Sequence, residues 1–281
     1  MNGASTTVFP VHVSFGSGET MTDESFQLFD SHAHLDASEF DPDRAEVLRH
    51  ARDAGVGDVL VPAVTADGWP KLHELCAADA GLHPAYGLHP CFLSRHADDD
   101  LARLEGWLDG HPAVAVGECG LDHFEPGLDR ARQLRLLQGH FELARRFDLP
   151  LVLHARHAFA QVIEALRVFG KPLRGVVHSF SGSLEQAREL YRIGFSVGIG
   201  GPATYERAQR LRRMVAALPA ECLLLETDAP DQPGSQRQGE RNEPAYLVEV
   251  LRCVAKLRGV DPAELAHITT GNARRLFLGA A

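Results

Sequence analysis

The sequence predicts a single α/β domain with the (β/α)8 barrel fold, and three observations support this prediction. Short apolar runs alternate with amphipathic segments along most of the chain, which is the pattern of strands that alternate with helices. The apolar runs number eight, and together with the intervening segments they occupy about 250 residues, the typical size of such a barrel. A doubly wound sheet is the alternative for any such alternation, but no G-x-G-x-x-G sequence follows the first run.

The eight apolar runs are expected to be the barrel strands. They cover residues 28–29, 56–64, 84–88, 113–116, 151–153, 175–177, 195–199 and 223–225. One intervening helix is expected to begin after Asp129, which suits an N-cap, and to end before Pro150. Its apolar positions recur at helical spacing and are expected to face the barrel: Leu134, Leu137, Phe141 and Ala144. Another helix is expected to begin at Ser183, because Gln186 stands three residues later, as in a capping box.

The composition restricts the class of protein. The chain has 281 residues, of which 44% are apolar and 23% are charged, as in soluble globular domains and unlike disordered chains. No apolar run reaches the length of about 18 residues that indicates a membrane-spanning helix. The 28 basic and 38 acidic residues give a net charge of −10, which argues against a protein that coats nucleic acid with a broad basic surface.

The cysteines and the first residues bear on location and domain organisation. Five cysteines, without a C-x-x-C pair, indicate a reducing compartment, so we expect a cytoplasmic protein; a monomer is the expected state. Residues 1–26 lack the basic start and unbroken apolar core of a signal peptide and are expected to be an irregular extension without a role in the chemistry. Residues 27–281 show no linker and are expected to form one domain.

Ionisable side chains stand at the downstream ends of most apolar runs. They are His32 and His34 after the first run, Glu118 after the fourth, His154 after the fifth, His178 after the sixth and Asp228 after the eighth. Because the C-terminal ends of barrel strands meet at one mouth, we expect these side chains to be neighbours. His89, after the third run, is expected near the same mouth. The remaining histidines are expected at the surface or on helices, among them His50, His73, His96 and His111.

This set of nitrogen and oxygen ligands predicts a site for two divalent metal ions. His32 and His34 are two residues apart, so they project from the same face of a strand and can chelate one ion. The ligands include no thiolate and suit Mg, Zn or Mn. A catalytic zinc takes about three protein ligands, so six ligands indicate two ions roughly 3.5–4 Å apart. Glu118 is expected to bridge them, and Asp228 to take a proton from the attacking water.

Other catalytic patterns are weaker. Residues 194–198 match the G-x-S-x-G sequence of serine hydrolases, but Ser196 lies inside an apolar run and not at a turn between a strand and a helix. None of the three lysines stands at a strand end, so a carbamylated lysine is not expected to bridge the ions. Arg156, two residues after His154, is the basic residue best placed to bind a phosphate group.

Five segments together resemble the motifs of the TatD family of metal-dependent deoxyribonucleases and related hydrolases. The segments are residues 29–35, 116–122, 154–156, 178–182 and 224–230, and they occur in family order within about residues 28–278. Residues 198–213, and Asp231 where the family more often has an aromatic residue, are most similar to the YjjV-like branch. The chain departs from the family at His123, where Tyr or Phe usually follows Gly-Leu-Asp.

The resemblance implies a TIM barrel that hydrolyses phosphodiester bonds, usually in DNA, with Mg or another divalent ion. One ion site would consist of His32, His34, Glu118 and Asp228. The other would consist of Glu118, His154 and His178.

The leading hypothesis is therefore a divalent-metal-dependent deoxyribonuclease that acts on single strands or ends of DNA. Glu118 and Asp228 would act at the ions, and Arg156 would stabilise developing negative charge. Single strands are expected because a mouth surrounded by loops admits a flexible chain more easily than a stiff duplex. The alternative is hydrolysis of a small amide, lactone or ester by the same ions. A non-enzymatic module with a structural metal is disfavoured, because structural metal sites are closed.

Overall fold

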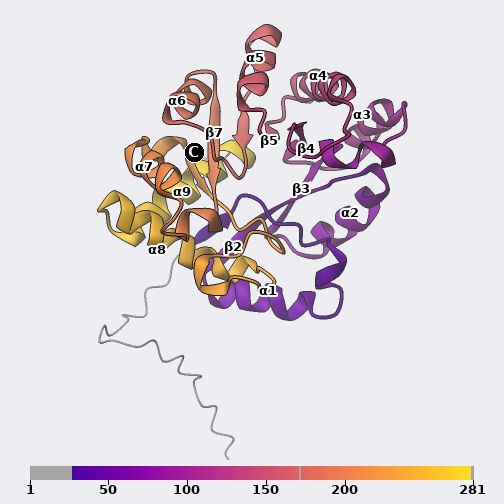
Figure 1. Ribbon diagram of the computed structural model, residues 1–281. Coiled ribbons are helices and arrows are strands. Elements are labelled where there is room, and N and C mark those ends of the chain that lie inside the picture. Colours follow the sequence, from indigo (N-terminus) through magenta and orange to yellow (C-terminus); the bar gives the residue numbers. More distant parts are fainter. Residues whose placement is uncertain (1–26, 171, 280–281) are drawn as a thin grey trace, which may run out of the picture.

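Eight parallel strands form a barrel that is surrounded by helices (Figure 1). The computed structural model describes residues 27–170 and 172–279; the expected extension, residues 1–26, lies outside them. Each strand pairs with the next in chain order. The strands are β1 Leu28–Asp30, β2 Val56–Pro62, β3 Leu82–Tyr86, β4 Ala115–Asp122, β5 Leu151–Arg156, β6 Gly175–Val177, β7 Phe195–Ile199 and β8 Leu223–Leu225. The predicted single-domain (β/α)8 barrel is therefore confirmed.

Helices connect the strands and cover the outside of the barrel (Figure 1). They are α1 Arg44–Asp53, α2 Trp69–Ala78, α3 Asp100–Gly110, α4 Arg130–Phe147, α5 Phe159–Phe169, α6 Leu184–Arg192, α7 Gln209–Ala217, α8 Leu247–Arg258 and α9 Pro262–Phe277. A 3-10 helix, η3 Pro90–Arg95, follows β3. Among the described residues, none of the helices combines the length and the apolar character needed to cross a membrane.

Hydrogen bonds at the ends of the first and last strands bring β1 and β8 together. The backbone N–H of Asp228 donates to the carbonyl of His32 at 2.8 Å. Thr227 donates through its backbone N–H and its hydroxyl to the buried Asp30 carboxylate, at 3.0 and 2.6 Å. A buried carboxylate requires such donors, so these bonds join the segments that follow β1 and β8.

The inside of the barrel is a packed core below the mouth. One buried residue from each of seven strands contributes to a single cluster with Phe277 of α9: Phe29, Leu60, Ala85, Ala115, Val152, Val176 and Leu224. Side chains two residues apart on a strand share a face. His154 therefore faces inward like Val152 and lies two residues closer to the mouth. By the same alternation, Glu226 lies on the mouth side of Leu224.

Strand β4 extends further than the sequence predicts. The expected strand covered residues 113–116, whereas β4 continues to Asp122, so Glu118 lies on the strand itself and not on a loop after it. Glycine makes this possible, because a Cβ at Gly120 would lie 1.9 Å from the carbonyl oxygen of His154 on β5. Only a residue without a side chain lets the two strands approach so closely.

The predicted helix starts are confirmed, and one prediction about a helix face is wrong. Asp129 caps α4, and Ser183 caps α6 with the expected capping box. Leu134 of α4 is 38% exposed and does not face the barrel. Gln133 occupies the buried position instead, because its amide accepts from the backbone N–H of Asp122 and donates to its carbonyl, both at 3.0 Å.

Asp58 on β2 links the barrel to α9. Its carboxylate accepts hydrogen bonds from His83 at 2.9 Å and from Arg274 at 2.8 Å. Burial raises the pKa of Asp58, but the bonds from His83 and Arg274 outweigh burial and hold this pKa below its ordinary value. The stabilisation is therefore fully present above the unfolded-state pKa of about 3.9, and it is lost as the pH falls through the lower folded-state pKa.

We expect Asp58→Asn to lower the free energy of unfolding at pH 7 by about 1 kcal/mol, a value that allows for screening by solvent. Urea denaturation at several pH values would measure it, and the difference from wild type should narrow below about pH 4. Asp53→Asn, at an exposed pair with Arg49, is the control and should have a smaller effect. A difference that stays constant between pH 7 and pH 3 would contradict this explanation.

Candidate metal centre

A cavity of about 870 Å³ opens at the C-terminal ends of the strands. Six of the seven side chains singled out from the sequence line it: His34, Glu118, His154, Arg156, His178 and Asp228. The seventh, His32, is fully buried and contacts Glu118. The structure therefore brings together all seven, from five different strand ends.

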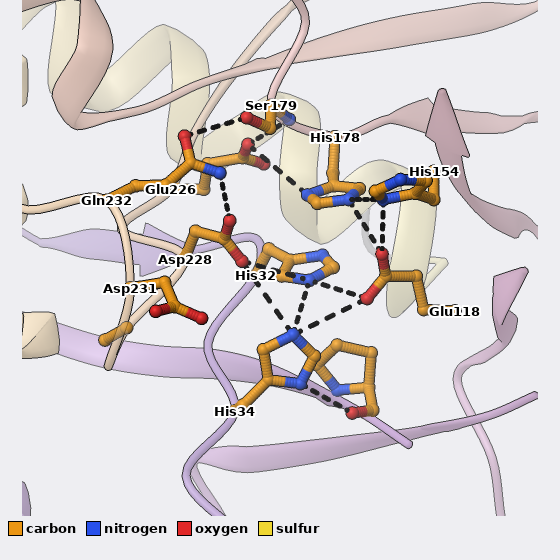
Figure 2. Close-up of polar contacts among 12 residues, drawn as sticks. His32, His34, Glu118, His154, His178, Ser179, Glu226, Asp228, Asp231 and Gln232 are labelled. Carbon is orange, nitrogen blue, oxygen red and sulfur yellow. Dashed lines mark hydrogen bonds and ion pairs between the residues drawn. The ribbon is translucent and has the colours of Figure 1, made fainter. Parts of the chain in front are cut away.

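Glu118 lies at the centre of the cluster, and its two oxygens face different histidines (Figure 2). Oε2 lies 3.2 Å from Nε2 of His32 and 3.5 Å from Nε2 of His34. Oε1 lies 2.8 Å from Nε2 of His178 and 3.1 Å from Nδ1 of His154. A carboxylate placed in this way between two pairs of imidazoles has the arrangement that a bridging ligand needs.

Asp228 faces the first pair of histidines from the last strand end (Figure 2). Its Oδ1 lies 3.5 Å from Nε2 of His32 and 3.8 Å from Nε2 of His34. Its backbone has a φ of 60°, in the left-handed region that non-glycine residues rarely adopt and that clusters at functional sites. The amide of Gln232 donates to the other oxygen, Oδ2, so Oδ1 remains directed at the histidines.

Two of the histidines are oriented through the ring nitrogen that faces away from Glu118. Nδ1 of His34 lies 3.2 Å from the carbonyl of Pro62, and Nε2 of His154 lies 2.9 Å from Oδ2 of Asp122. Such partners fix the tautomer and leave the other ring nitrogen free to bind an ion. Sequence reasoning assigned no role to Asp122, although its even spacing from Glu118 on one strand was a signal for it.

The segment after β3 brings a further histidine and a thiol to the cluster. Nε2 of His89 lies 2.9 Å from Oε1 of Glu118 and 3.3 Å from Nδ1 of His154, which confirms that His89 lies at the mouth. Cys91 Sγ donates to Oδ2 of Asp122 at 3.3 Å. The ligand set predicted from the sequence contained no thiol, because Cys91 lies on η3 and follows no apolar run directly.

The expectation that His96 belongs to the surface or helix background is wrong. It is 5% exposed, and its Nε2 donates to the carbonyl of His89 at 2.9 Å. This bond gives the buried His96 ring a hydrogen-bond partner and helps to hold the η3 segment in place.

The surrounding histidines hold Glu118 in its charged form. Burial raises the pKa of this carboxyl, but His89, His178 and His32 outweigh burial and hold its pKa well below the ordinary value. Burial lowers the pKa of His178, yet the Glu118 charge outweighs burial and raises the pKa of His178 to about 10. A carboxylate surrounded by imidazoles thus stays ionised, as a metal ligand must.

Arg156 lies at the rim of the cavity and is exposed. Its guanidinium carbon lies 3.7 Å from the centre of the Phe124 ring, which holds the charge by a cation–π contact. Phe124 in turn is fixed by its backbone N–H, which donates to Oδ1 of Asp122 at 2.9 Å. Arg156 is therefore a preoriented cation beside an otherwise acidic and imidazole-rich site.

The donor chemistry of the cluster fits divalent metal ions. Three groups bring one possible ligand atom from each member to within 4.8 Å of one another: His32, His34 and Asp228; His32, Glu118 and His178; and His89, Cys91 and His154. Oε2 of Glu118 is buried and has no hydrogen-bond partner among the described residues. A buried carboxylate oxygen without a donor calls for a cation.

Comparisons with known proteins agree with this geometry. A family described as TatD related DNase matches residues 29–278. The metal-dependent hydrolase YjjV of Escherichia coli K12 is 40% identical over 253 residues, which cover 89% of this chain and 98% of that protein. The 3'-5' ssDNA/RNA exonuclease TatD of Cronobacter sakazakii is 36% identical over 257 residues, with 89% and 98% covered. The crystal structure of the Escherichia coli YjjV protein superposes with a TM-score of 0.87 at 39% identity, over 89% of this chain and 98% of that one.

Barrel and cluster together define a metal-dependent hydrolase. The chain belongs to the TatD family.

Asp122 provides a first test of the cluster. We expect Asp122→Asn to weaken binding of divalent ions by about 10–100-fold. The variant keeps an acceptor for the loop at Phe124 but replaces the charged acceptor that orients His154. Metal retained after dialysis against graded chelator would measure the change. Asp98→Asn, at an exposed position beside Arg132, should retain wild-type affinity. Equal affinity in the two variants would show that Asp122 does not orient a ligand.

Proposed function

We propose that this hydrolase is a nuclease that cleaves phosphodiester bonds in single-stranded DNA or at DNA ends, with two divalent ions at the barrel mouth. The observation that carries the proposal is the position of Glu118, whose two oxygens face separate pairs of histidines. The name of the Cronobacter relative, a single-stranded DNA and RNA exonuclease, supports the substrate class.

The ligands divide into two sets that share Glu118. His32, His34 and Asp228 would hold one ion with it, and His154 and His178 would hold the other. Ions bound in this way supply Lewis acidity, which polarises a phosphoryl oxygen and promotes loss of a proton from water. Two divalent ions also add a charge of about +4 at the mouth, so phosphate can be attracted locally although the whole chain carries −10.

Two side chains would act on the substrate and the water. Oδ1 of Asp228 faces the first pair of histidines and is the acceptor for the proton of the attacking water. Its other oxygen is occupied by the Gln232 amide, so the proton has one defined destination. Arg156 at the rim would bind the phosphate group next to the scissile bond and stabilise charge that develops there.

The test is an assay of chelator-stripped protein with Mg, Mn and Zn restored separately. The substrates are single-stranded DNA, duplex DNA, RNA, a p-nitrophenyl phosphodiester, a p-nitrophenyl carboxylic ester and a lactone. We expect cleavage of single-stranded DNA that requires an added ion and exceeds cleavage of duplex DNA. Turnover of the ester or lactone without turnover of any phosphodiester would overturn the proposal in favour of a small-molecule hydrolase.

A further inference from the structure

A thiol lies within the ligand cluster at a position that the proposed two-ion centre does not use. Cys91 lines the cavity, is partly buried and donates from Sγ to Oδ2 of Asp122 at 3.3 Å. The same oxygen lies 2.9 Å from Nε2 of His154. Two donors, one on sulfur and one on nitrogen, therefore converge on a single carboxylate oxygen, which places the Cys91 thiol beside the His154 ring.

His89 completes this group from the opposite direction. It is 8% exposed, its Nδ1 accepts from the backbone N–H of Cys91 at 3.1 Å, and its Nε2 lies 3.3 Å from Nδ1 of His154. One ligand atom each from His89, Cys91 and His154 lie within 4.8 Å of one another. The hydrogen bond from His96 to the carbonyl of His89 holds in place the segment that carries His89 and Cys91.

We infer that His89, Cys91 and His154 form a third metal subsite, beside the two-ion centre, that takes a thiophilic divalent ion such as Zn²⁺. Sulfur and imidazole ligands favour zinc, whereas Mg²⁺ takes oxygen ligands and keeps its water. Binding exchanges the thiol proton of Cys91 for a sulfur–metal bond and that proton leaves to solvent, while each histidine binds as a neutral ring through the nitrogen that carries no proton. Asp122 contacts two of the three ligands, Cys91 and His154, and so helps to position them.

The subsite has a consequence that rests on the proposed function. His154 belongs both to the subsite and to the second ion site of the nuclease centre. An ion held by Cys91 therefore competes for His154, and excess zinc is expected to inhibit a protein that is active with Mg²⁺. Mg²⁺ itself is not expected to inhibit, because it does not occupy the thiol subsite.

The test measures metal binding without any substrate. Chelator-stripped wild-type protein, Cys91→Ser and Cys253→Ser are titrated with Co²⁺, and the thiolate-to-cobalt charge-transfer absorption is recorded. Cys253 is a partly buried thiol outside the cavity, beside Arg212, and so serves as the matched control. We expect the absorption in wild type and in Cys253→Ser, and its loss in Cys91→Ser. Absorption that persists in Cys91→Ser, or that is absent from wild type, overturns the subsite.

Equilibrium dialysis against Zn²⁺ and against Mg²⁺ gives a second measurement. Cys91→Ser is expected to bind zinc at the subsite at least about tenfold more weakly than wild type does, whereas magnesium binding is expected to be equal in the two proteins. Cys91→Ala, with its melting temperature recorded, separates loss of the ligand from loss of folding. Equal zinc binding by wild type and both folded variants refutes the inference. Because no DNA is present, failure of the nuclease proposal would leave these results unchanged, and the two failures are distinguishable.

Discussion

Replacement of Glu118 by Gln is expected to lower kcat for phosphodiester hydrolysis by at least about 10³-fold, which corresponds to about 4 kcal/mol of transition-state stabilisation. Glu118 contacts both pairs of histidines, each through a separate oxygen. Gln keeps the size of the side chain but carries no charge and offers a single acceptor oxygen. Both ion sites should therefore weaken together, whereas loss of a histidine should weaken one of them.

Metal analysis after gel filtration, together with single-stranded DNA cleavage at saturating Mn²⁺, would measure the Glu118→Gln effect. Glu39→Gln is the matched control, since Glu39 also lines the cavity but contacts none of the histidines of the cluster. The control should retain its ions and its activity. If Glu118→Gln kept both ions and a kcat close to that of wild type, the carboxylate would not be a bridge.

Replacement of Asp228 by Asn is expected to reduce kcat by about 10²–10⁴-fold while the fold survives. An amide cannot accept the proton that leaves water, yet it retains the shape of the carboxylate and can still pair with Gln232. The loss should appear mainly in kcat, because Asp228 is proposed to act on the water and not on the substrate chain.

The Asp228→Asn measurement compares kcat and KM on a single-stranded oligonucleotide, with melting temperature as the check on folding. Asp231→Asn provides the control, because Asp231 lines the same cavity three residues further along and has no role in the proposed chemistry. Activity near that of wild type in Asp228→Asn would remove Asp228 as the proton acceptor. An equal loss in both variants would assign the effect to charge in the cavity in general.

The fold could be predicted from the sequence because each barrel strand is buried and therefore apolar. All eight strands fall where an apolar run was found. The end of β4 could not be predicted, because it depends on contacts with β5. Gly120, which usually weakens a strand, is required there by the approach of the His154 backbone. The buried face of α4 also could not be predicted fully from the sequence. Gln133 is buried in place of Leu134 because its amide makes two hydrogen bonds to the backbone of Asp122 on β4.

The proposed ligands could be predicted because all of them follow strands, and barrel geometry brings strand ends together. The residues that surround these ligands could not be predicted from the sequence. Asp122 contacts His154 through the pairing of β4 with β5, and Cys91 reaches the cluster from η3. The even spacing of Asp122 from Glu118 places both on one strand face but does not name His154 as the partner, and Cys91 has no periodic signal at all, because both contacts depend on how separate segments meet in three dimensions.

The joining of the first and last strands has a consequence for synthesis of the protein. Thr227 and Asp30 are separated by 197 positions in the chain. The backbone of Asp228 is hydrogen-bonded to that of His32 at the same place. During translation, the histidines after β1 leave the ribosome long before their partner carboxylate has been made. A chain that stops before β8 therefore lacks both the closing bonds of the barrel and the proposed proton acceptor. Catalytic competence is thus tied to completion of the polypeptide.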